Sequence, residues 1–215
     1  MEALMRHRIG LVLLAATASI ACSERGLNAD RAASLIGGLE QFKREAHLTI
    51  RTGVPLQTAF RCESQADVER TPVNRFVADR GWVRYETREA ILGFGTKSAC
   101  PAMALTPAGE AASEQWTRGQ VAPGDGIAWR IPIGRREFVG ATVLTTAPDE
   151  SARVEFDWKW TANETGAALR KSIPKADALF DQVRKGRASC RRSDDGWRCQ
   201  MGMWTTPTDI GEFQL

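Results

Sequence analysis

Histidine, the side chain most often used for acid–base catalysis and zinc binding, is scarce in this chain. The sequence contains two histidines, His7 and His47. His7 precedes an apolar N-terminal run, so His47 is the only imidazole left if that run belongs to a cleaved leader. One imidazole cannot build a multi-histidine zinc site, and no Gly-x-Ser-x-Gly motif accompanies it to form a Ser-His-Asp triad. We therefore expect His47 to be a capping or surface residue at the end of a helix.

Carboxylates offer a second route to chemistry, because a glycosidase needs only two of them about 5 to 10 Å apart. Glu155 and Asp157 lie two residues apart in a strand-like segment, which places them on one face about 7 Å apart. Arg153 and Lys159 flank them, so the pattern favours a solvated charge ladder over a catalytic pair. A carboxylate-dependent hydrolase stays open as an alternative function.

Two glycine-containing segments match known ligand loops only in part. Asp194-Asp195-Gly196 lacks the further spaced oxygen ligands of a calcium loop. Gly93-Phe94-Gly95 lacks the third glycine and the preceding βαβ unit of a dinucleotide-binding motif. We therefore expect no metal ion and no cofactor.

The N-terminal segment has the organisation of an export signal. Arg6 and Arg8 precede an apolar run over residues 9–21, which is shorter than the roughly 20 residues of a membrane span. The run ends in Ser19-Ile20-Ala21-Cys22, which resembles a bacterial lipobox. The resemblance implies cleavage before Cys22 and attachment of acyl chains such as palmitate to that residue, which together anchor a protein stably. An ordinary cleaved secretion signal is the alternative.

This resemblance also predicts the location and the domain organisation. Ser23, rather than aspartate, follows the cysteine, and the similarity to enterobacterial lipoproteins favours the outer membrane, facing the periplasm, over the inner membrane. We expect a signal peptide over residues 1–21, a lipidated tether over 22–28 and a single domain over 29–215. The mature protein would contact the membrane through lipidated Cys22.

The charge balance argues against nucleic acid as a partner. The whole chain has a formal net charge of +3, and removal of the leader takes away Arg6, Arg8 and Glu2, which lowers that charge by one. Nucleic-acid-binding domains usually carry a concentrated basic face. The near-neutral balance and the export signal therefore both exclude this class.

The cysteines provide a test of the export prediction. With Cys22 acylated, four cysteines remain, an even number suited to an oxidising compartment. Ser193-Asp194-Asp195-Gly196 is a good turn sequence, and it would place Cys190 opposite Cys199 on a hairpin. We therefore pair Cys190 with Cys199 and Cys62 with Cys100, while free buried thiols remain the alternative.

Periodicity predicts an α+β fold. Apolar residues at helical spacing indicate a helix over residues 28–46, and two Thr-Pro pairs indicate helices over 72–79 and 107–116. A fourth helical stretch follows Asn163, is interrupted at Pro174 and continues to a Gly186 cap. Apolar and charged residues alternate over 154–160, which predicts a strand with one buried face. With strands expected over 82–86, 128–133 and 138–146, we predict an antiparallel meander of about 3–5 strands with several short helices and a C-terminal disulfide hairpin.

Part of the chain is similar to a known but uncharacterised class. The segment over residues 131–137, together with Trp158-Lys159-Trp160 and Asn163-Glu164-Thr165-Gly166, resembles stretches of uncharacterised putative lipoproteins of Gram-negative bacteria. This resemblance covers a small part of the chain and implies the class of protein without an activity.

Tryptophan and arginine are the remaining candidates for function. The chain contains seven tryptophans and one tyrosine, and an exposed indole can stack on a sugar or anchor a protein interface. We expect Trp158 and Trp160 to pack in the core. The candidate binding surface is a basic, tryptophan-containing cluster near the C-terminal hairpin that could meet an anionic envelope polymer or a protein: Arg187, Arg191, Arg192, Arg198, Trp197 and Trp204.

These observations favour a lipid-anchored envelope protein that acts as a non-enzymatic binding module for a protein or an anionic envelope polymer. The carboxylate-dependent hydrolase is one alternative. A structural lipoprotein without a specific ligand is the other.

Overall fold

The computed structural model describes residues 26–121, 126–202, 211–213 and 215. The fold is α+β, as predicted, but its main sheet has seven strands and not three to five. Those strands are β1 (Glu45–Thr52), β4 (Thr117–Val121), β5 (Gly126–Thr146), β6 (Ser151–Ala162), β7 (Arg184–Ser193), β8 (Gly196–Met201) and β9 (Glu212–Phe213). A separate two-stranded sheet contains β2 (Val83–Ile91) and β3 (Lys97–Leu105).

Short helices lie between these strands. Each of α1, α2, α4 and α5 begins at a polar residue whose side chain accepts a hydrogen bond from a backbone N–H of the first turn. The helices are α1 (Ala29–Gly37), α2 (Gln65–Arg70), α3 (Pro72–Asp79), α4 (Pro107–Ser113), α5 (Glu164–Ser172) and α6 (Pro174–Asp177), with a single 3₁₀ turn, η1 (Gly93–Gly95).

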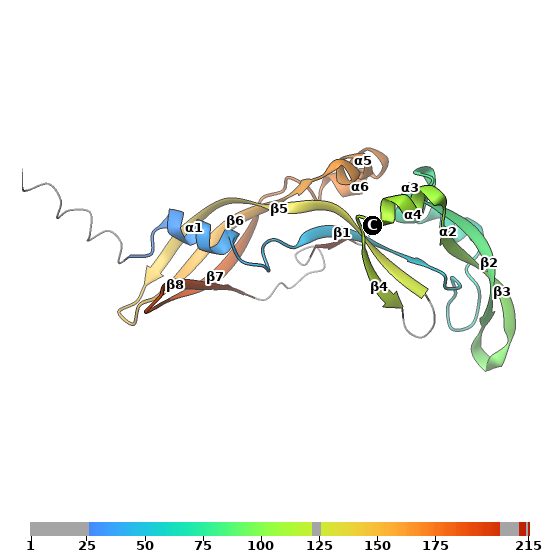
Figure 1. The fold of residues 1–215 in the computed structure, drawn as a ribbon, viewed down its shortest axis with the longest axis horizontal. Helices are drawn as coiled ribbons and strands as arrows, with labels where there is room; N and C mark the ends of the chain where they lie inside the picture. The colour runs from blue at the N-terminus through green and yellow to red at the C-terminus, as the bar shows by residue number, and fades with distance from the viewer. Residues whose placement is uncertain (1–25, 122–125, 203–210, 214) are drawn as a thin grey trace, which may run out of the picture.

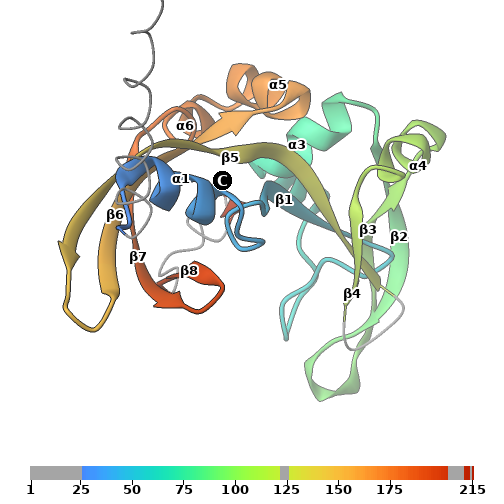
Figure 2. The same ribbon diagram turned by 60° about the vertical axis from the view of Figure 1, so that its left-hand side comes forward.

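Strand β5 organises the main sheet, which curls into a half-barrel (Figure 1, Figure 2). The strand order is β8-β7-β6-β5-β1-β9, and β4 also pairs with β5. The first half of β5 lies between β1 and β4, whereas its second half pairs with β6. One long strand therefore links two ends of the molecule that carry different neighbours.

The two strands predicted over residues 128–133 and 138–146 are both parts of β5. Gly134 lies between them, and a Cβ atom at this position would come within 2.5 Å of the Thr161 carbonyl oxygen on β6. A register shift between Phe138 and Gly140 then absorbs the curvature without ending the strand. Glycine permits the close packing at position 134 and the bulge at position 140. The strand therefore continues through a segment where the sequence pattern predicts two separate strands.

The concave side of the sheet carries a continuous core. On β6, Val154, Phe156, Trp158 and Trp160 are each at most 2% exposed, so the predicted period-two strand is confirmed, as is the core packing of both tryptophans. Helix α1 covers this face, contacts β5 and β8, and buries Ile36 completely. The core also includes residues of α3, β2 and β3, which joins the two-stranded sheet to the main one.

Several helix predictions need correction. Helix α1 ends at Gly37, where two consecutive glycines make its continuation costly. Ala46 lies in β1 and not in this helix. The observed helix is therefore about half as long as the helix predicted over residues 28–46. Residues 117–121 form β4 after a short α4. The helical stretch predicted after Asn163 and interrupted at Pro174 is confirmed as α5 and α6. Its predicted continuation to Gly186 is wrong because α6 ends at Asp177 and β7 begins at Arg184, where it pairs with β6. The predicted helix over 72–79 is confirmed as α3.

Both predicted disulfides are present. Cys190 and Cys199 are directly opposite each other in the β7–β8 hairpin, and Cys62 bonds to Cys100 of β3. Among the described residues, no helix is long and apolar enough to cross a bilayer. Cys22 and the leader lie outside the described residues.

Candidate binding groove

The arginines of the predicted hairpin surface lie on β7 and β8 and mostly form ion pairs. Arg187 lies 3.3 Å from Glu155, Arg192 lies 3.1 Å from Glu150, and Arg198 lies 2.7 Å from Asp195. Arg191 is exposed. Hydrogen bonds from Ser151 are the main cause of the lowered pKa of the Asp149 carboxyl, and the charge of Arg191 lowers this pKa further.

The tryptophans of that predicted surface do not support it. Trp197 is 5% exposed and belongs to the core, so the expectation that it lies on the surface is wrong. Its position on β8 turns the indole inward, whereas Arg198 faces solvent. Trp204 lies outside the described residues. Within the described part, the hairpin is therefore a basic, ion-paired face without an exposed indole.

The carboxylates of β6 form the charge ladder that the sequence indicates. Asp157 lies 3.5 Å from Lys185, and Glu155 is paired with Arg187 as described above. Lys159 completes the row with Glu137 of β5 at 3.7 Å. These cross-strand pairs account for the alternating charges without a catalytic pair.

His47 lies near the start of β1, not at a helix end as predicted. It faces away from the core beside Glu212 of β9, in a pocket of about 530 Å³ that also contains Arg130. Burial lowers the pKa of His47, and Arg130 lowers it further, while the Glu45 carbonyl and Glu212 act in the opposite direction. The imidazole is therefore held toward its neutral form.

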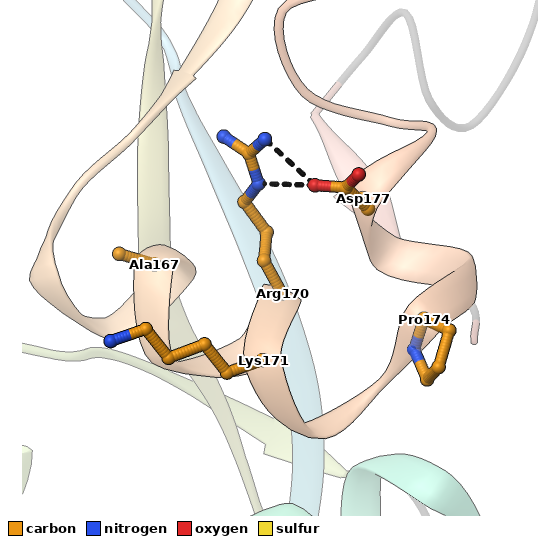
Figure 3. A pocket seen from close by; sticks show the side chains of 5 residues that line it. All are labelled: Ala167, Arg170, Lys171, Pro174 and Asp177. Atoms are coloured by element: carbon orange, nitrogen blue, oxygen red, sulfur yellow. Dashed lines mark hydrogen bonds and ion pairs between the residues drawn. The ribbon is translucent and has the colours of Figure 1, made fainter.

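A second hollow, between α5 and α6, is lined by side chains that form ion pairs with one another. Arg170 donates to Asp177 at 2.7 Å, as Figure 3 shows, and to Asp181 at 2.6 Å. These hydrogen bonds raise the pKa of Arg170. Because both carboxylates already bind this guanidinium, the hollow is best explained as a packing contact between the two short helices.

The most favourable candidate site is a groove between the two-stranded sheet and the main sheet. It has a volume of about 510 Å³, within the range typical of small-ligand sites. We call it the tryptophan groove. Residues from β1, β2, β3, α4, β4 and β5 line it, including Thr52, Arg84, Glu86, Arg88, Glu110, Ser113, Arg118 and Trp129.

Three partly buried indoles form a continuous chain behind and within this groove. The ring centroids of Trp82 and Trp116 are 5.2 Å apart, and those of Trp116 and Trp129 are 6.1 Å apart, both with edge-to-face geometry. Such contacts add rigidity beyond simple area burial. Trp129 is the member that lines the groove.

Local contacts hold these indoles in place. Thr106 caps α4 by accepting a hydrogen bond from Gly109 N–H, and its own N–H donates to the Trp82 carbonyl at 3.0 Å. Helix α4 is thereby fixed against the turn before β2, and Trp116 lies three residues beyond the end of this helix. Trp129 donates its indole N–H to Thr52 at 2.8 Å.

The charges in the groove alternate along one face of β2. Glu86 lies 2.6 Å from Arg88 and 3.9 Å from Arg84. Arg88 also donates to the Gly53 carbonyl at 3.0 Å, which fixes this row against the end of β1. With Arg118 and Glu110, the lining has three arginines and two glutamates.

Arg118 is placed to bind a ligand together with Trp129. Its guanidinium lies 5.9 Å from the centroid of the Trp129 ring. Within the described part of the chain, Arg118 has no carboxylate partner. A cation and an aromatic face therefore border the same groove, with Arg118 exposed and Trp129 half-buried.

Sequence reasoning did not find this groove. The three indoles are far apart in the sequence, and the pattern that predicts a helix over residues 107–116 does not indicate the strand β4 that follows it. The high tryptophan content is the available signal, but the cluster of basic residues in the sequence points to the hairpin and not to the groove. Comparison with protein-family models, curated proteins and solved structures found no match.

Proposed function

We propose that this protein is a lipid-anchored, non-enzymatic envelope protein whose tryptophan groove binds an acidic glycan. The anchor would be Cys22, and the partner an anionic polymer of the envelope. The sequence also favours a binding function, but the binding surface is the groove and not the C-terminal hairpin.

The observation that carries the proposal is the pairing of Trp129 with Arg118. A sugar ring offers an apolar face that stacks on an indole, and an acidic sugar also offers a carboxylate for a guanidinium. The row of Arg84, Glu86 and Arg88 supplies further donors and acceptors for hydroxyl groups. The excess of arginine over glutamate in the lining favours an anionic ligand.

Binding without hydrolysis is favoured by the surroundings of the carboxylates. Glu86 lies between two arginines, whereas the general acid of a glycosidase lies in an apolar or acidic setting. Glu155 and Asp157 are ion-paired on the opposite part of the sheet. The hydrolase alternative would require Glu110, the other carboxylate of the groove lining, and predicts that Glu110→Gln abolishes cleavage of a glycan.

The test uses the full chain and soluble peptidoglycan fragments, which carry both sugar rings and carboxylates, in isothermal titration calorimetry. Neutral chito-oligosaccharides serve as the uncharged probe. We expect Arg118→Ser to weaken binding of the acidic fragments about tenfold, as expected for loss of a charge-assisted hydrogen bond. Binding of the neutral probe should change little.

Arg191→Ser is the matched control, because Arg191 is also an exposed strand arginine but lies on the C-terminal hairpin. It should leave binding unchanged. If Arg191→Ser weakens binding and Arg118→Ser does not, the hairpin surface is the binding site and the groove proposal is wrong.

The anchor is tested separately. Cys22→Ser should remove the acyl mass from the N-terminal peptide and release the protein from the membrane fraction. A wild-type N-terminal peptide without acyl mass would support the ordinary secretion signal instead.

A further inference from the structure

The most exposed large apolar side chains of the described structure gather at one end of the molecule. Phe94 is 99% exposed, Phe60 is 72% exposed and Ile91 is 67% exposed. The rings of Phe60 and Phe94 are 6.2 Å apart. We call these three residues the phenylalanine tip.

The tip is a built unit made from two loops. Gly93 N–H donates to the Ala59 carbonyl at 2.6 Å, which joins the end of the β2–β3 hairpin to the loop that carries Phe60. A Cβ atom on Gly93 would lie 2.6 Å from the Phe60 ring, so glycine is needed for this approach. The disulfide between Cys62 and Cys100 ties the same two segments together.

Phe94 contributes little to the stability of this fold. Its backbone has φ of 62° and ψ of 18°, in the left-handed region that favours glycine and disfavours bulky residues. Its ring remains in water and gains almost no burial in return. An aromatic residue held out in a disfavoured conformation is best explained by a contact outside the chain.

The charged residues that lie nearest to Phe60 and Phe94 in the sequence are basic. The terminal segments over residues 58–61 and 91–97 contain Arg61 and Lys97 and no carboxylate. The closest acidic residues are Glu63, two residues after Arg61, and Glu89, which is paired with Lys97 at 3.0 Å and lies two residues before Ile91. Exposed apolar side chains with flanking basic residues are typical of a surface that enters the interface of an anionic membrane.

The position of the tip favours a bilayer over a protein pocket. The tip lies at the free end of the β2–β3 hairpin, and α1 lies at the opposite end of the long axis (Figure 1). A projecting apolar end can penetrate the deformable surface of a bilayer, whereas a protein partner would need a matching cavity. We propose that the phenylalanine tip inserts into the headgroup region of an anionic phospholipid bilayer. This contact is independent of the glycan groove.

The test is flotation of the full chain with phosphatidylcholine vesicles that contain or lack phosphatidylglycerol. All proteins carry Cys22→Ser, so that acylation is removed equally from each. Phe60→Ser combined with Phe94→Ser should lower the partition coefficient for anionic vesicles about tenfold, because apolar area is lost from the interface. Arg61→Ser should lower it about fivefold in low salt and less in high salt.

The matched control is Val139→Ser combined with Leu144→Ser. These β5 residues are 51% and 50% exposed and lie away from the tip, and their replacement should leave the partition coefficient unchanged. Amide hydrogen exchange of residues 92–95 should also slow on anionic vesicles. The proposal would be overturned if the two double variants partitioned equally. It would also be overturned if hydrogen exchange slowed with detergent-solubilised envelope proteins but not with lipid.

Discussion

The indole N–H of Trp129 donates a hydrogen bond of 2.8 Å to the hydroxyl of Thr52, which is 5% exposed at the end of β1. This contact fixes the aromatic face that borders the tryptophan groove. It also joins the two strands at the point where the main sheet approaches the two-stranded sheet.

Thr52→Val tests the positioning of Trp129. The variant keeps the side-chain shape but leaves the indole N–H without its acceptor, so we expect a loss of about 1–2 kcal/mol in the free energy of unfolding. Binding of acidic glycan should weaken as well. Thr49→Val is the control, because Thr49 lies on the other face of β1; an equal loss in both variants would argue against a special contribution of Thr52.

Glycine at position 109 is required by the contact between α4 and the turn that carries Trp82. A Cβ atom there would lie 1.9 Å from the Trp82 carbonyl oxygen, so Gly109→Ala should destabilise the protein by about 2–3 kcal/mol. Gly37 in α1 has open space around its Cβ position, and Gly37→Ala should stabilise by about 0.5–1 kcal/mol. Urea unfolding measures both, and a neutral Gly109→Ala would contradict the close packing.

The two disulfides should contribute unequally to stability. Cys62 and Cys100 are separated by 38 positions in the sequence, and Cys190 and Cys199 by 9. Because a longer closed loop restricts the unfolded chain more, replacing the first pair by alanine should cost about 4 kcal/mol, against about 2.5 kcal/mol for the second. Urea unfolding of the two double variants gives the comparison; the reverse order would show that local packing outweighs chain entropy.

The pH dependence of stability should include a contribution from His47. Burial, with help from Arg130, lowers the pKa of this imidazole below its ordinary value of 6.5. As the pH falls through about 6.5, the unfolded chain takes up a proton before the folded protein does, so stability declines from that pH downward. His47→Asn should flatten this decline, as measured by unfolding at a series of pH values. An imidazole that titrates above 6.5 by NMR would reverse the sign.

Local signals in the sequence predict the elements that local chemistry determines. The alternation around Phe156 identifies β6, because one face must pack and the other must meet water. Pro72 after Thr71 marks the start of α3 correctly. The turn between Cys190 and Cys199 identifies the hairpin and hence both disulfides.

Long-range pairing determines the elements that sequence reasoning missed. The segment before Gly186 has helical spacing at Leu179 and Val183, but α6 ends at Asp177 and β7 begins at Arg184, where it pairs with β6. The continuity of β5 across Gly134 likewise depends on the close approach of Thr161. The groove also depends on contacts between distant parts of the sequence, since α4 and β4 bring Trp116 and Arg118 beside β5.

The central claim is that acidic glycan binds beside Trp129. Seven indole N–H signals are expected in a ¹⁵N NMR spectrum of this chain, one for each tryptophan. On addition of peptidoglycan fragments, the Trp129 signal should shift most and that of Trp116 next, while the buried Trp158 and Trp160 signals stay in place. Shifts confined to Trp197 or Trp204, with Trp129 unchanged, would contradict the claim.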